Sequence, residues 1–273
     1  MKKRYLFLFI AVIIMTVLAI SVYAEDGDFK VGLECNYAPF NWTQTDDSNG
    51  AVAIKDGIGF CGGYDVEMAK LIAKDLGKNL VIVKTEWDGL IPALNANKID
   101  AVIAGMSPTE ERKVSVDFSD PYYESELVIV VRKDGKYTGA TSIQDFKGAK
   151  ITGQQNTFHY TVIPQINGVD VQPAMADFPS MIVALSSKKI DGYISERPGA
   201  ISAVASNTDL TFVEFAEGKG FTVSPEDVAV SVAVKKGNTD LISSINKTLS
   251  GVSKDDRQKM MDTAVANQPL SAN

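Results

Sequence analysis

The sequence predicts an α/β protein made of two similar lobes, each with a helix-covered, mostly parallel β-sheet. The first reason is an internal repeat. Residues 91–103 (IPALNANKIDAVI) are echoed by residues 182–194 (IVALSSKKIDGYI), with Ala-Leu and Lys-Ile-Asp in register. A single repeat of this length indicates two similar halves rather than a solenoid of short units. The second reason is that strand patterns alternate with helical patterns, which favours parallel sheets covered by helices.

Polar residues follow the predicted strand in both copies of the repeat. Ser107 and Arg112 follow the first copy, and Ser195 and Glu196 end the second. A positive group from one half can therefore face a negative group from the other. Because a buried zwitterion needs both a cation and an anion from the protein, this pattern suits a small zwitterion held between two lobes.

Residues 1–24 have the pattern of a signal peptide. Basic residues at 2–4 precede an almost unbroken apolar run over 5–22, and Val22 and Ala24 are the small residues expected before cleavage at Glu25. The alternative is an uncleaved anchor, because the run is just long enough to span a bilayer. We expect an exported protein, in the periplasm or at the outer face of the cell membrane.

Charge and cysteine content narrow the classes of partner. The formal net charge is −7, so nucleic acid and anionic lipid are poor partners and a cationic solute fits better. Cys35 and Cys61, with His159 as the single histidine, do not make a metal-site pattern. In an oxidising compartment we expect them to form a disulfide, with two reduced, buried cysteines as the alternative. We expect no cofactor and no metal, and a monomer.

The elements of the first lobe follow from periodicity and end signals. Asp65 is expected to cap a helix that Gly77 ends. We predict strands at 28–33, 80–85 and 101–104, helices at 66–76 and 88–97, and a polar surface hairpin or excursion at 43–59.

Two β-branched strands, 127–131 and 228–234, are interpreted as paired connectors where the chain crosses between lobes. They divide the chain into a discontinuous lobe 1 (25–126 plus 228–273) and lobe 2 (127–227). The remaining predicted elements are strands at 150–153, 192–195 and 210–215 and helices at 178–187, 239–249 and 253–261.

Arg112 is the first candidate for a binding residue. Ser107 and Pro108 suit the N-cap and the first turn of a short helix that contains Arg112. A helix N-terminus with a guanidinium one turn further on is a good carboxylate receptor, because both bind anionic oxygens. The alternative is a surface ion pair with Glu110 or Glu111.

At this point the sequence shows a resemblance to a known family. It resembles the extracellular solute-binding proteins of the polar amino acid type, which are receptor subunits of ABC importers, and most of all the lysine/arginine/ornithine-binding members. The resemblance covers residues 28–250 and implies the two-lobed periplasmic-binding-protein fold of type II, with a two-strand hinge. The motifs that carry it are YAPFNW (37–42), GYDVEMAKLIAKDLG (63–77), WDGLIPALNANKIDAVIAGMSPTEERKVSVDFSDPYY (87–123), DFKGAKI (145–151) and KIDGYISE (189–196).

The resemblance implies how an amino acid backbone would be held. Arg112 and the backbone of Ser107 would bind the α-carboxylate, joined by backbone N–H groups from the Asn156-Thr157-Phe158 turn. The carboxylate of Glu196, the Ser107 hydroxyl and the carbonyl of Gly105 would take the α-ammonium. Where the family often has Asp this chain has Glu196, and where the family has a Ser-Ser pair it has Ala104-Gly105, which removes one hydroxyl.

The same resemblance implies a site for the ligand side chain. Tyr37 and Trp87 would flank it, since aromatic faces attract a guanidinium or an ammonium. Glu34, with Asp65 nearby, would meet its distal end. The alternatives are a core role for the two aromatic residues and a surface salt bridge for Glu34. His159 either lines the pocket or serves as a structural hydrogen-bonding residue.

We therefore predict the binding subunit of an amino acid ABC importer, with a permease partner and arginine or lysine as ligand. Glutamine and histidine are the rival ligands, because a carboxylate can also accept from a neutral donor. A cyclohexadienyl dehydratase-like enzyme on the same fold is the rival from another class, although no sequence feature shows the proton donor that it needs. A sensory receptor would share the site.

Overall fold

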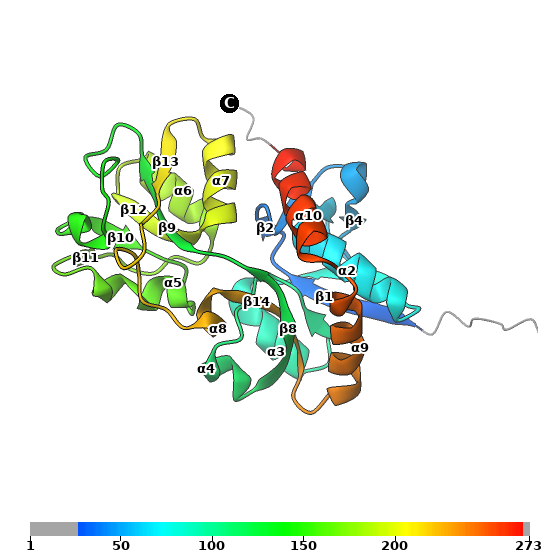
Figure 1. Cartoon of the computed structure of the whole chain (residues 1–273). Helices are drawn as coiled ribbons and strands as arrows, with labels where there is room; N and C mark the ends of the chain where they lie inside the picture. The colour runs from blue at the N-terminus through cyan, green and yellow to red at the C-terminus, as the bar shows by residue number, and fades with distance from the viewer. Residues whose placement is uncertain (1–26, 270–273) are drawn as a thin grey trace, which may run out of the picture.

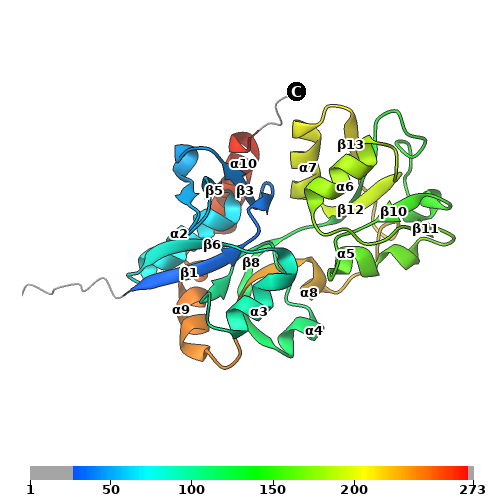
Figure 2. The ribbon, with the colours of Figure 1, turned by 180° about the vertical axis from the view of Figure 1, so that it is seen from behind.

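The computed structural model describes residues 27–269 and confirms an α/β protein with two lobes (Figures 1 and 2). The predicted signal peptide lies outside the described residues. No helix in the described part of the chain is long and apolar enough to cross a membrane.

The sheet of the first lobe has three parallel strands followed by two antiparallel pairings. β1 is parallel to β6 and β7, whereas β14 is antiparallel to both β7 and β8. The strand order is β6 (Asn79–Lys84), β1 (Asp28–Leu33), β7 (Ala101–Val102), β14 (Ala229–Lys235), β8 (Val116–Glu124). The helices of this lobe are α2 (Tyr64–Asp75), α3 (Leu90–Asn95), α4 (Glu110–Lys113), α9 (Thr239–Ser250) and α10 (Lys254–Asn267).

The sheet of the second lobe has the same plan. β10 is parallel to β11 and β12, whereas β9 is antiparallel to β12 and β13. The strand order is β11 (Asp170–Val171), β10 (Lys150–Thr152), β12 (Gly192–Glu196), β9 (Leu127–Arg132), β13 (Leu210–Val213). The helices between these strands and β14 are α5 (Phe158–Thr161), α6 (Phe178–Ser186), α7 (Arg197–Ser206) and α8 (Pro225–Val228).

The predicted surface excursion, residues 43–59, contributes β4 and the end of β3 to a small antiparallel sheet on the first lobe. Its strand order is β2 (Asn36–Tyr37), β3 (Asn41–Gln44), β5 (Phe60–Gly62), β4 (Val52–Ala53). The predicted disulfide joins Cys35, at the start of this sheet, to Cys61 in β5, with Cα atoms 5.7 Å apart. The bridge therefore fixes the hairpin that carries Tyr37.

The internal repeat is confirmed as a repeated structural unit. In the first copy the Asp100 amide donates to the carbonyl of Lys30 in β1 at 2.8 Å, and its carboxylate accepts from the Lys30 amide at 2.8 Å. In the second copy the Asp191 amide and carboxylate bond Lys150 of β10 in the same way, at 2.8 and 2.9 Å. Each aspartate thus ties the end of its repeat to the neighbouring parallel strand.

The prediction that residues 127–131 and 228–234 pair with one another is wrong. β9 and β14 lie in different sheets, and each is the fourth strand of its sheet. The β-branched runs correctly identify two strands, but they do not identify the neighbours of those strands. In the structure β14 forms a long antiparallel pair with β8, and β9 forms antiparallel pairs with β12 and β13. The chain crosses between the sheets beside these strands, where the Ser125 amide donates to the Val228 carbonyl at 3.1 Å.

Two predicted helix caps are also wrong. Gly63, with a φ of 123°, occupies the N-cap of α2, and Asp65 is the second helical residue. Thr109 rather than Ser107 caps α4 and accepts from the Arg112 amide. Both predicted caps have other partners, because the Ser107 hydroxyl donates to the Asp227 carbonyl at 2.8 Å and the Asp65 carboxylate is used inside the lobe.

Strand β8 and helix α7 were not predicted from the sequence. Strand β8 contains Pro121 and several polar residues, and its pairing with β14 is interrupted by register shifts. A proline inside a run argues against a strand by pattern alone. Helix α7 has many small residues and lacks a clear apolar stripe. Both are defined by their tertiary neighbours rather than by periodicity.

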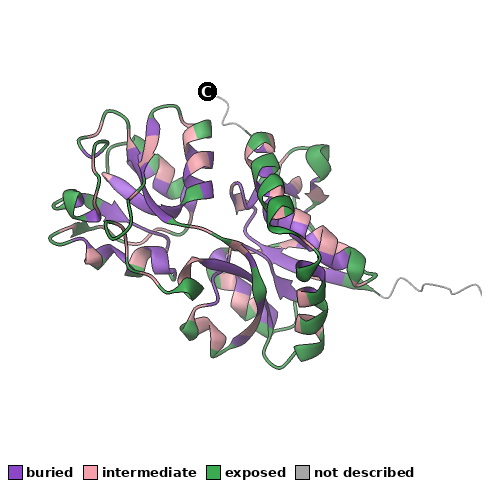
Figure 3. Cartoon of the chain, in the orientation of Figure 1, coloured by how far each residue is buried: buried purple, intermediate pink, exposed green. Residues whose placement is uncertain are grey.

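The side chains of strand β9 alternate between the two apolar clusters of the protein. Val128 and Val130 belong to the apolar cluster that extends into the first lobe, whereas Ile129 and Val131 belong to the cluster on the other face of the second sheet. This alternation is the normal period of a strand. Figure 3 shows the strands of both sheets buried and the outer faces of the helices exposed.

We expect no free thiol in the exported, non-reduced protein, because Cys35 and Cys61 are bridged. Reduction should lower the melting temperature, since a disulfide across a sequence separation of 26 stabilises by about 3 kcal/mol. Thiol labelling followed by mass spectrometry and thermal unfolding with and without reductant measure both effects. A Cys35→Ser, Cys61→Ser double variant is the control, and its melting temperature should be the same with and without reductant. Two labelled cysteines in freshly purified protein would refute the bridge.

Candidate functional site

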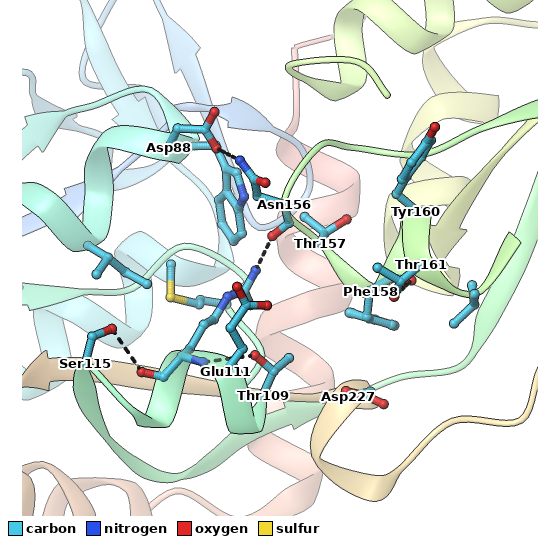
Figure 4. A pocket seen from close by; sticks show the side chains of 15 residues that line it. Asp88, Thr109, Glu111, Ser115, Asn156, Thr157, Phe158, Tyr160, Thr161 and Asp227 are labelled. Carbon is cyan, nitrogen blue, oxygen red and sulfur yellow. Dashed lines mark hydrogen bonds between the residues drawn. The ribbon is translucent and has the colours of Figure 1, made fainter. Parts of the chain in front are cut away.

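Two neighbouring cavities lie between the lobes, at the ends of the central strands. The outer cavity has a volume of about 590 Å³ and is drawn in Figure 4. The inner cavity has a volume of about 10 Å³. Trp87, Arg112, Thr157 and Phe158 line both of them. In α/β proteins, ligands bind outside the carboxyl ends of such strands.

The structure brings most of the predicted binding residues together. Those that line the inner cavity are Tyr37, Trp87, Gly105, Ser107, Arg112, Thr157, Phe158 and His159. Glu196 and Glu34 lie behind this lining, each in contact with a residue of it. Asp65 lies beneath the cleft and lines neither cavity.

The guanidinium of Arg112 lies between the lobes. Nη1 donates to the Ser107 carbonyl of the first lobe and Nη2 to the Asn156 carbonyl of the second, both at 2.9 Å. The group also stacks over the ring of Trp87 at 4.9 Å from the ring centroid. Burial lowers the pKa of Arg112 to about 10, so it keeps its positive charge at neutral pH. This is a fixed cation with donors aimed across the cleft.

Glu196 supplies the opposing negative charge from the end of β12. The hydroxyl of Tyr37 donates to its Oε2, and Nε2 of His159 lies 3.1 Å from the same oxygen. Burial acts to raise the pKa of Glu196, but His159 and the hydrogen bonds from His159 and Tyr37 outweigh it, and the pKa is lowered. Burial and the charge of Glu196 raise the pKa of Tyr37, so the phenol keeps its proton and remains a donor.

The aromatic residues of the cleft pack against one another. The ring of Tyr37 lies between Phe178 of the second lobe, with centroids 4.2 Å apart and planes at 13°, and Phe40 of the first lobe, at 5.0 Å and 27°. Both faces of Tyr37 therefore contact protein rings, and one face of Trp87 contacts Arg112. A ligand side chain flanked by Tyr37 would need Phe178 to withdraw with the second lobe.

Glu34 is buried in an acidic part of the cleft. Its Oε1 accepts from Nε2 of Gln154 in the second lobe at 3.3 Å. Burial raises the pKa of Glu34 to about 8, the Gln154 hydrogen bond opposes this, and the charges of Asp177, Glu86 and Asp88 raise it further. At neutral pH the carboxyl is mostly protonated, but a cation beside it would be attracted by Asp177, Glu86 and Asp88 and would favour the ionised form of Glu34.

The lobes are joined by polar contacts between Asp88 of the first lobe and Gln155 and Asn156 of the second, which were not predicted from the sequence. Asp88 of the first lobe accepts from Gln155 at 2.6 Å and from Asn156 at 2.8 Å, and Figure 4 shows Asp88 facing Asn156 at the rim of the outer cavity. Gln154 and Phe178 were missed as well. Gln154 lies two residues after the end of β10, so the rule that binding residues follow parallel strands could have found it. Phe178 had no comparable signal.

Within residues 27–269 no group of three or more His, Cys, Asp or Glu side chains could hold a metal ion. The arrangement instead presents one fixed cation and one fixed anion from opposite lobes, with aromatic rings and a second, mostly neutral carboxyl nearby. These groups can bind a small zwitterion with an extended side chain.

The fold and cleft define a two-lobed binding protein of the periplasmic type II class. The chain belongs to the bacterial extracellular solute-binding proteins, family 3, whose family model matches residues 29–264. The family resemblance is therefore confirmed, and the chain is a binding protein rather than an enzyme, as predicted.

Three similar proteins illustrate the range of this family. The chain is 32% identical over 232 residues to the L-cystine-binding protein TcyJ of Escherichia coli (strain K12), covering 85% of this chain and 79% of the relative. It is 34% identical over 195 residues to a probable histidine-binding protein of Campylobacter jejuni, covering 71% and 70%. The crystal structure of the amino acid ABC transporter substrate-binding protein AbpA from Streptococcus pneumoniae, bound to L-arginine, has a TM-score of 0.74 and 26% identity, covering 90% of this chain and 98% of that one.

Glu34→Gln should change how stability depends on pH. The folded-state pKa of about 8 lies above the unfolded value of about 4.3, so between these values the folded protein binds the extra proton. The stability that this proton contributes is fully present below about pH 4.3 and is lost as pH rises toward 8, at no more than about 1.4 kcal/mol per pH unit. Urea unfolding from pH 5 to 9 should show that the free energy of unfolding of the variant increases relative to that of the unaltered protein as pH rises.

Glu110→Gln is the matched control for this prediction, because the Glu110 side chain is 86% exposed on α4. Its stability should follow the unaltered protein at every pH. If the Glu34→Gln curve also runs parallel to that of the unaltered protein, the raised pKa of Glu34 is contradicted.

Proposed function

We propose that this protein is the substrate-binding subunit of an amino acid ABC importer and captures a cationic L-amino acid, arginine or lysine. The observation that carries the proposal is the opposition of Arg112 and Glu196 across the cleft of a family 3 solute-binding protein. An α-carboxylate and an α-ammonium are the ligand groups that match this pair. Glu196 is buried and Arg112 is partly buried, and each would gain a charge-assisted hydrogen bond from such a ligand.

The α-carboxylate would lie against Arg112, Ser107 and the backbone of Thr157 and Phe158, which line the inner cavity together. The α-ammonium would lie against Glu196, with the Gly105 carbonyl and the Ser107 hydroxyl as further acceptors. The Ser107 hydroxyl donates its proton to the Asp227 carbonyl, so its oxygen remains free to accept.

The distal cation would meet Glu34. The carboxylates of Asp177, Glu86 and Asp88 raise the pKa of Glu34, and the same negative field favours a positive ligand group. Arginine is the ligand of the similar AbpA structure. Cystine and histidine are named for other relatives, so these ligands and glutamine are the competitors that a binding screen must include.

Capture would close the lobes about the two chain crossings near Ser125 and Val228. We propose the lobe boundaries that the sequence predicts, 25–126 with 228–273 and 127–227, which the membership of the strands in two sheets supports. We further propose a cleaved signal peptide, an exported monomer and a membrane permease as the partner of the closed form.

Thermal-shift measurement with the twenty L-amino acids and cystine tests the proposal. Arginine or lysine should give the largest shift, because a ligand at 100 times its Kd adds about 2.7 kcal/mol to stability. Arg112→Ala should weaken every amino acid, since loss of one partner of a buried charged pair costs about 2–5 kcal/mol. Lys113→Ala, at the neighbouring exposed ion pair with Glu110, is the control and should bind normally. Absence of any shift with the unaltered protein would sink the proposed function.

Glu34→Gln should weaken arginine selectively. A charge-assisted contact is roughly twice as strong as a neutral one, so we expect a loss on the order of 1–3 kcal/mol for arginine and a smaller change for glutamine. Arginine should also bind the unaltered protein more tightly as pH rises toward 8, because a distal cation favours ionised Glu34. Calorimetry at pH 6.5 and 8.5 measures both effects. Equal losses for the two amino acids would remove Glu34 from the distal site, and Glu67→Gln, at a surface ion pair, is the control.

A further inference from the structure

Asp65 is a buried carboxylate that the proposed binding contacts do not use. It lies in the first turn of α2 with no exposed surface, and within residues 27–269 its side-chain hydrogen-bond partners, Asn41 and Tyr122, are neutral. Burying a charge without a cation is costly unless several donors satisfy it. The donors that surround Asp65 therefore indicate what the group does.

The donors come from three separate elements of the first lobe. The Tyr122 hydroxyl in β8 donates to Oδ1 at 2.7 Å, and the Asn41 amide in β3 donates to Oδ2 at 2.8 Å. The Gly105 N–H also faces this carboxylate and lies 3.3 Å from the Tyr122 hydroxyl oxygen. Asp65 thus links β3, the segment after β7, and β8 at one point beneath the cleft.

Two of these donors hold the floor of the cleft. Asn41 pairs directly with Tyr37 in the small sheet, and the backbone amide of Asp65 donates to the Phe40 carbonyl at 2.8 Å. Gly105 has a φ of 61°, and a Cβ there would lie 2.9 Å from Tyr37 Cε1. The Gly105 peptide and the Tyr37 ring are therefore packed in contact. Asp65 bonds Asn41, the strand partner of Tyr37, and Tyr122, which accepts from the Gly105 N–H.

We propose that Asp65 is a positioning residue for amino acid binding: by accepting from Asn41 and from Tyr122, whose hydroxyl oxygen in turn accepts from the Gly105 N–H, it holds the Gly105 peptide and the Tyr37 hairpin where the ligand's α-ammonium binds. The inference rests on the proposed function of this cleft. Burial raises the pKa of Asp65 to about 6, so at neutral pH it is an ionised group that only accepts, as the donors from Asn41 and Tyr122 require.

This role differs from the one that the family resemblance implied, in which Asp65 lies near the distal end of the ligand. The two roles predict different selectivity. A positioning residue beneath Gly105 affects the α-ammonium, which all amino acids share. A distal carboxylate would affect arginine and spare glutamine.

Asp65→Asn tests the role, because it keeps the size of the side chain and replaces one acceptor with a donor that opposes the existing donors. We expect arginine and glutamine to lose affinity by the same factor, about tenfold or more. Tyr122→Phe removes only the bridging hydroxyl and should cause a smaller loss in the same direction. It carries the test if Asp65→Asn does not fold.

Asp117→Asn is the matched control. Asp117 also holds a backbone N–H of the first lobe, that of Gly237 at 2.7 Å, but it lies at the other end of β8 from Tyr122. It should lose stability without losing affinity, which separates positioning from general destabilisation. Calorimetric titration with L-arginine and L-glutamine, beside thermal unfolding of each variant, provides both readouts.

Equal affinity of Asp65→Asn and the unaltered protein, or a loss confined to arginine, would overturn the positioning role alone. A loss of affinity in Asp117→Asn equal to that in Asp65→Asn would overturn it too, because the effect would then follow stability. If the unaltered protein binds no amino acid, the proposed function fails and this inference fails with it.

Discussion

A buried charge needs a partner, and this constraint organises the whole cleft. Glu196 and Asp65 are ionised groups removed from water, Arg112 is a partly buried one, and Glu34 avoids the same cost by keeping its proton. The partners of Arg112, Glu196 and Glu34 come in part from the opposite lobe. The electrostatics of the site therefore depend on how the two lobes meet, and a change in their separation alters the surroundings of these three groups at once.

The repeated unit explains why two sheets can present complementary edges. In each copy an aspartate bonds both the amide and the carbonyl of a lysine in the neighbouring parallel strand. This sets the register of the strand that leads to the cleft. The residues that follow are free to differ, and they supply a guanidinium after β7 and a carboxylate at the end of β12. Similar scaffolds thus carry opposite charges.

The sequence allowed the fold class, most strands and the pair Arg112 and Glu196 to be predicted, because residues that follow parallel strands gather at one edge. It could not give the stacking of Tyr37 on Phe178, which depends on the relative placement of two lobes. It misassigned Asp65, because a capping rule is local whereas the donors of this carboxylate come from β3, β8 and the segment after β7. The partners of β9 and β14 were also beyond reach, because a β-branched run marks a strand without naming its neighbour.

The contacts inside the cleft also bear on selectivity under the proposed function. The phenol of Tyr37 donates to Glu196, and the amide of Gln154 donates to Glu34, and both donors are neutral. A ligand ammonium at Glu196 would replace a neutral hydrogen bond with a charge-assisted one, which favours every amino acid. At Glu34 a guanidinium favours the ionised carboxylate and then gains in the same way, whereas a neutral amide only exchanges one neutral donor for another. The preference for a cationic ligand therefore arises because a charged ligand donor forms a stronger hydrogen bond to Glu34 than the neutral donor that the protein itself provides.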